Sequence, residues 1–161
     1  QKGRNQLLEG RERNVMREMD SFSYAMGVID AFNEVVRAGV KKLALAHPVR
    51  DRQLREELAQ AAESICAQYG TRLYREDDPL LTDLFPVSLN RGTYNILFYQ
   101  NEEVLSEYLE LKQRKKQLQE EGRYAGQERK EIARSFGHLL SYTDEAIERL
   151  IAGNHEKEAF S

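Results

Sequence analysis

The sequence predicts an α/β protein: a small, mainly parallel sheet of about three strands, flanked by helices and followed by a helical C-terminal part. Three observations lead to this class. Apolar residues recur at helical spacing along most of the chain, and short apolar or aromatic runs interrupt them. One such run is followed by a helix and a second run, which is the order of a βαβ unit. The strands of a βαβ unit are parallel and covered on both faces.

The composition predicts one soluble domain. The chain has 161 residues, which is about one domain, with 40% hydrophobic and 32% charged residues. No apolar run approaches the ~20 residues that a membrane-spanning helix needs. We therefore expect no membrane association.

The N-terminal part of the chain has a charged segment followed by a predicted helix. Residues 1–19 are charge-dense and are predicted to be a frayed helix or a tail. A single α/β domain is predicted over 20–153. Asp20 or Ser21 can cap its first helix, which ends at Gly39. The apolar stripe of this helix recurs at helical spacing: Phe22, Ala25, Met26, Ile29, Phe32 and Val36.

A βαβ unit is predicted next. Residues 43–47 form an apolar run, and Pro48 disfavours a helical conformation at the residue before it. Asp51 then caps a helix that Gly70 closes, and 71–76 is the second strand. Strands joined in this way are expected to lie side by side and to run in the same direction.

The rest of the chain gives one more strand and then helices. A long connection covers 77–92, in which Asp78-Pro79 could begin a helical turn. Residues 93–100 are aromatic and β-branched and are predicted to be a strand. A helical part spans 101–153, and 154–161 is predicted to be a loose tail.

The candidate site follows from the predicted sheet, because ligands bind beyond the carboxyl ends of parallel strands. An imidazole beside a carboxylate is a workable acid/base pair, so His47 and Asp78 are the catalytic candidates. The ligand-binding candidates are the charged residues next to them: Arg50, Asp51, Asp77 and Asp83. The alternative is structural: His47 as an ordinary residue before a proline, and the acidic run as a solvated loop.

Several functions lack their sequence signals. No dinucleotide fingerprint, phosphate loop or nucleophile elbow is present, and no CxxC or HxxxH spacing, so we assign no cofactor and no metal. The net charge of -3 argues against nucleic acid. The basic run 112–116 is interpreted as a solvated helix face paired with glutamates of the same helix. Cys66 is interpreted as a buried thiol rather than a nucleophile, and a single cysteine favours the cytoplasm.

Two functional hypotheses remain. The first is a binding or interaction protein that forms a homo-oligomer through its C-terminal helices, because these are more than a three-stranded sheet needs for cover. The second is a small enzyme or ligand-binding domain with a cleft for a small anion or a metal at His47, Asp77 and Asp78. Whether the chain is an enzyme stays open at this stage.

Overall fold

A computed structural model describes residues 21–159, and the predicted N-terminal helix or tail over 1–19 lies outside the described residues. Residues 21–37 are helical. The elements that follow are β1 (Leu43–Leu45), α2 (Arg52–Tyr69), β2 (Arg72–Glu76), α3 (Val87–Asn90), β3 (Asn95–Tyr99), α4 (Glu102–Glu120), α5 (Gly126–Leu139) and α6 (Asp144–Gly153). The predicted order of the longer helices and the strands is confirmed.

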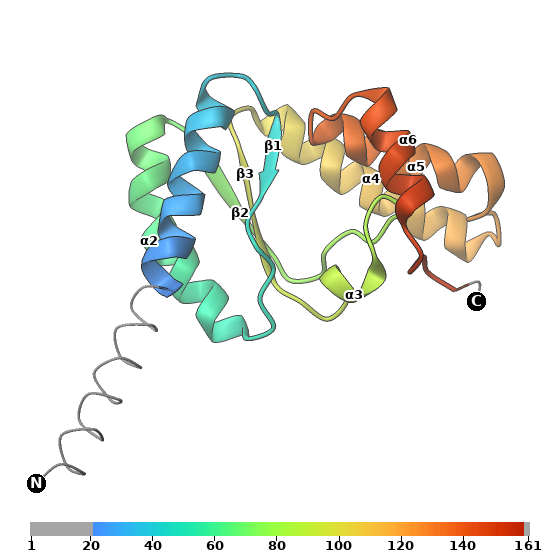
Figure 1. Ribbon diagram of the computed structural model, residues 1–161, viewed down its shortest axis with the longest axis horizontal. Helices are drawn as coiled ribbons and strands as arrows, with labels where there is room; N and C mark the ends of the chain where they lie inside the picture. The colour runs from blue at the N-terminus through green and yellow to red at the C-terminus, as the bar shows by residue number, and fades with distance from the viewer. Residues whose placement is uncertain (1–20, 160–161) are drawn as a thin grey trace, which may run out of the picture.

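The predicted parallel sheet is wrong. The sheet has the order β1-β3-β2, and β3 pairs antiparallel with both of its neighbours. Leu43 lies opposite Tyr99 on one side, and Arg72 lies opposite the same residue on the other. β1 and β2 do run in the same direction, but β3 separates them, so they do not lie side by side (Figure 1).

The burial of β3 on both faces explains why its sequence has the pattern of a strand in a parallel sheet. All five residues of β3 are buried. Along this strand Leu97 and Tyr99 join one apolar cluster, while Ile96 and Phe98 join another on the opposite face. A strand covered on both faces is apolar throughout, which is the usual pattern of a parallel sheet. Here helices cover both faces of an antiparallel sheet, so the same pattern arises without parallel pairing.

Three layers result from this arrangement (Figure 1). The helix over 21–37 and α2 cover one face, where Ala59 and Ala62 of α2 pack against the sheet. α4, α5 and α6 cover the other face, where Tyr108 of α4 and Phe136 of α5 pack in the core. The stretch between β2 and β3 crosses from one edge of the sheet to its centre.

Local signals placed the helix ends correctly. The Asp51 carboxylate accepts a hydrogen bond from the backbone N–H of Gln53 at 2.9 Å and caps α2. Gly70 ends this helix at a φ of 69°, a left-handed conformation that favours glycine. The Thr143 hydroxyl caps α6. The helical turn predicted at Asp78-Pro79 is wrong, because the short helix of this stretch is α3.

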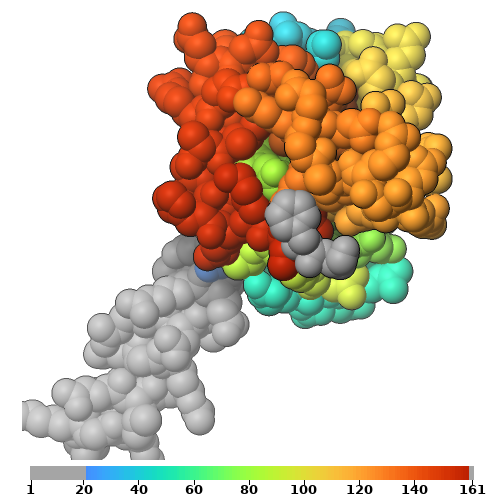
Figure 2. Space-filling view, turned by 90° about the vertical axis from the view of Figure 1, so that its right-hand side faces the viewer, coloured from blue at the N-terminus to red at the C-terminus, as the bar shows by residue number. Residues whose placement is uncertain are grey.

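α5 and α6 approach each other closely at one glycine. A side-chain carbon added at Gly137 would lie 2.5 Å from Cγ1 of Ile147, so only glycine fits without a shift. Figure 2 shows these two helices in orange and red, with a green part of the stretch between β2 and β3 visible between them. Among residues 21–159, no helix is long and apolar enough to cross a membrane.

Candidate functional site

The predicted site residues do not converge on one cleft. His47 is exposed, and no hydrogen bond or ion pair joins it to Asp77, Asp78 or Asp83 in the described part of the chain. Because β3 lies between β1 and β2, the carboxyl ends of these two strands are not neighbours. The catalytic roles of His47 and Asp78 stay a prediction, but the adjacent parallel strands on which they depended are absent.

Each remaining candidate has a separate interaction. Arg50 donates to the backbone carbonyl of Ser88 at 3.3 Å, and Asp51 is the cap of α2. Asp83 is buried and accepts two hydrogen bonds from Arg129 of α5, at 2.8 and 2.9 Å. Only Asp77 lies in a larger cluster at the strand ends.

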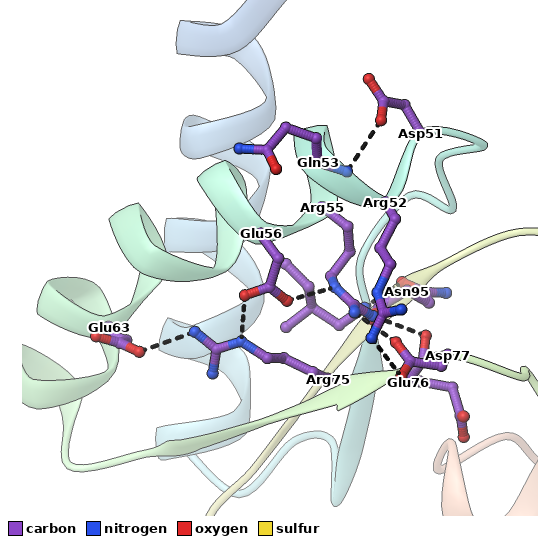
Figure 3. A network of polar contacts seen from close by, with 11 residues as sticks. Asp51, Arg52, Gln53, Arg55, Glu56, Glu63, Arg75, Glu76, Asp77 and Asn95 are labelled. Carbon is purple, nitrogen blue, oxygen red and sulfur yellow. Dashed lines mark hydrogen bonds and ion pairs between the residues drawn. The ribbon is translucent and has the colours of Figure 1, made fainter.

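That cluster is built around Arg55, whose side chain is fully buried (Figure 3). The guanidinium donates to the backbone carbonyls of Glu76 and Asn95, at 2.9 and 3.2 Å. These two residues are the last partners of the β2–β3 ladder. Arg55 also donates to Asp77 at 2.5 Å and to Glu56 at 3.1 Å. A buried arginine therefore fills the place at the strand ends where the sequence predicted a ligand.

The charge of Arg55 also sets the state of Asp77. The hydrogen bond from Arg55, opposed by desolvation, lowers the pKa of Asp77 below its ordinary value. Arg52, three residues earlier on α2, contributes a second ion pair at 3.4 Å. Because this carboxylate is held ionised by two arginines, it is poorly suited to exchange protons near neutral pH.

A second cluster lies on the opposite face of the sheet, around Glu76. Figure 3 shows the Glu76 side chain pointing away from Arg55. This buried carboxylate accepts hydrogen bonds from the Tyr108 hydroxyl at 2.6 Å and from the Lys112 ammonium at 2.9 and 3.0 Å. It also accepts from the backbone N–H of Asp78 at 2.9 Å. The four oxygen lone pairs of the carboxylate are thus largely used.

The Glu76 cluster holds Lys112 in a fixed place. Burial, and then the neighbouring carboxylate, raise the pKa of Tyr108 above its ordinary value, so the hydroxyl stays protonated and donates. Lys112 completes its bonds with the backbone carbonyl of Asp78 at 2.7 Å. A paired and hydrogen-bonded arrangement of this kind is what a buried charge requires.

Lys112 lines a hollow that we call the α4 groove, between α4 and residues 78–81. Its volume is about 420 Å³. Lys112, Lys115 and Lys116 all line it, because positions three and four apart share one face of a helix. Leu109 adds an apolar wall, and Asp78 is the one predicted site residue in this hollow. The α4 groove is the candidate functional site.

The sequence contained a signal for this groove that was missed. Tyr108, Leu111 and Leu118 form the buried seam of α4, and Lys115 occupies the seam position between them. A lysine in an apolar seam needs a partner from another element. The intrahelical pairing predicted for the basic run is wrong for Lys112 and Lys115, which bond to Glu76 and Glu158 instead.

Neither the search for metal-binding groups nor the comparison with known proteins assigns a further site. In the range 21–159, no three His, Cys, Asp or Glu side chains are grouped so that they could hold a metal ion. Burial is the largest cause that raises the pKa of the Cys66 thiol, which fits an inert buried cysteine. No protein-family model, curated protein or solved structure matches this chain.

Proposed function

We propose that this chain is a binding protein whose α4 groove takes an anionic ligand. The observation that carries the proposal is the alignment of Lys112, Lys115 and Lys116 on one wall of a hollow of about 420 Å³. Lys116 is exposed, and no described residue bonds its ammonium. It is the cation that a ligand can engage without breaking an existing contact.

A binding role is favoured over catalysis because the buried carboxylate that contacts Lys112 has no free position for a proton. Glu76 accepts from Tyr108, Lys112 and the backbone of Asp78, so it orients the lysine rather than facing the groove. Fixed charge beside the apolar side chain of Leu109 suits recognition of an organic anion. A cytoplasmic location belongs to this proposal and rests on the single cysteine of the sequence.

The binding proposal predicts that citrate stabilises the protein in a saturable way. Citrate at 100 times its dissociation constant should add about 2.7 kcal/mol to the free energy of unfolding. Lys116→Gln should weaken citrate binding about two- to fivefold, as expected for one exposed charge contact. Isothermal titration calorimetry at low salt measures both affinities.

The matched control is Arg114→Gln, which removes the same charge from an exposed position of α4 outside the groove. It should leave citrate affinity unchanged. His47→Ala should also have no effect, because His47 lies after β1 and does not line this groove. Loss of citrate binding in His47→Ala would instead support the strand-end site that the sequence predicted.

Self-association through the C-terminal helices stays a prediction with less support. The apolar faces of α4, α5 and α6 pack on the sheet and on one another. Among the described residues of these helices, the large apolar side chains that are exposed are Leu109 and Leu150, at 38% and 36%. These two residues belong to different helices, so they do not by themselves define one interface. A single-chain mass by light scattering at micromolar concentration would count against an oligomer.

A further inference from the structure

The segment over 154–159 follows α6 without helix or strand, yet alternate residues of it bond the body of the protein. The Asn154 side chain donates to the backbone carbonyl of Asp83 at 3.0 Å. The carbonyl of Glu156 accepts from the N–H of Val87 at 2.9 Å. Two residues further on, the Glu158 carboxylate accepts from Lys115. Contacts at every second residue are the mark of an extended peptide docked along one side.

Glu158 lines two neighbouring hollows. It lines the α4 groove and also a second hollow of about 240 Å³, which contains Arg91 and Tyr124. Gln119 is the other residue that both hollows share. The two hollows are therefore neighbouring parts of one trough along the C-terminal half of α4, and Glu158 lies between them.

The trough binds both the charge and the backbone of this residue. Lys115 donates to the Glu158 carboxylate at 2.6 Å, and both side chains are largely buried, at 9% and 12% exposed. Arg129 donates to the backbone carbonyl of Glu158 at 2.9 Å. Arg91 lies 3.7 Å from the same carboxylate. Recognition of a carboxylate together with a main-chain carbonyl fits a peptide better than an isolated small anion.

One more donor is present beside this contact. The Tyr124 hydroxyl oxygen is buried and has no hydrogen-bond partner among the described residues. The Nζ atom of Lys115 and the Cζ atom of Arg129 lie over the Tyr124 ring, at 5.2 and 5.0 Å from its centroid. Burial raises the pKa of Tyr124, so the hydroxyl remains a donor. A buried donor without an acceptor costs free energy that an additional acceptor would recover.

We propose that the ligand of the α4 groove is an extended acidic peptide, and that residues 154–159 occupy part of its place as an internal ligand, with Glu158 as the competing carboxylate. This inference rests on the proposed function and names its ligand class. A tethered segment competes at an effective concentration on the order of millimolar. The intact chain should therefore bind a free peptide weakly, and loss of the Glu158 charge should strengthen that binding.

The test uses the full chain and a capped peptide of its own sequence 154–159, NHEKEA, labelled for fluorescence anisotropy. Glu158→Gln should bind the peptide at least fivefold more tightly than the unmodified chain. A peptide with glutamine in place of its second glutamate should lose this gain. The matched control is Glu145→Gln, an exposed change of the same charge on α6 outside the trough, which should leave peptide affinity unchanged.

The outcomes separate the two proposals. Equal peptide affinity of Glu158→Gln and the unmodified chain, with citrate still bound, would overturn the peptide inference and leave the anion site in place. Absence of both citrate and peptide binding would overturn both. Glu158→Asp keeps the charge but retracts it, and it should show a smaller gain in the same direction if the glutamine variant does not fold.

Discussion

Arg55→Met is expected to lower the free energy of unfolding by roughly 3–5 kcal/mol, the usual cost of removing one member of a buried charged network. The substitution leaves the carbonyls of Glu76 and Asn95 without their side-chain donor at the open end of the β2–β3 ladder. It also removes the 2.5 Å contact that holds Asp77. Denaturant unfolding followed by circular dichroism measures the loss.

The control for this prediction lies three residues earlier on the same helix. Arg52 forms an ion pair with the same Asp77 at 3.4 Å, but its side chain is 65% exposed. Arg52→Met should therefore cost less than about 1 kcal/mol. If both variants lost the same stability, the contribution of Arg55 would come from the shared ion pair, and the bonds to the strand carbonyls would contribute little.

The helices were predictable because their signals are local. Asp51 and Gly70 delimit α2 within the sequence itself, and Thr143 does the same for the start of α6. The pairing of the strands was not predictable in this way. β3 follows β2 after a long connection, and no local feature shows whether it joins an edge or inserts between β1 and β2. With both faces buried, alternation of polar and apolar residues was absent too.

The candidate site at His47 and Asp78 lost its structural basis with the strand order, because the two residues were expected to be neighbours only in a sheet where β1 pairs with β2. The contacts that replace it are remote in sequence. Glu76 meets Tyr108 and Lys112, 32 and 36 residues further along the chain. Such pairs become visible only when the helix after β3 has been placed on the sheet. Lys115 in the apolar seam was the one local anomaly that pointed to the groove.

Asp83→Asn is expected to destabilise the fold by a similar amount, about 3–5 kcal/mol, because it removes one charge from a buried and hydrogen-bonded ion pair. The carboxylate of Asp83 accepts hydrogen bonds from Nε and Nη2 of Arg129. Asp83 is 8% exposed and Arg129 is 6% exposed. The hydrogen bond with Asp83 is also the largest cause that raises the pKa of Arg129. Because arginine is not deprotonated in proteins, Arg129 stays charged in the variant while it loses the negative charge of its main partner.

A double-mutant cycle with Arg129→Gln isolates this pair. The double variant should lose less stability than the sum of the single losses, by roughly 0.5–3 kcal/mol, because residues in direct contact are coupled. Asp144→Asn is the exposed control: its carboxylate pairs with His138 but is 84% exposed, so a much smaller loss is expected. Asp83 was a ligand-binding candidate from the sequence, and that role makes the opposite prediction. If Asp83→Asn kept the stability of the fold and weakened ligand binding, Asp83 would belong to a site rather than to the core.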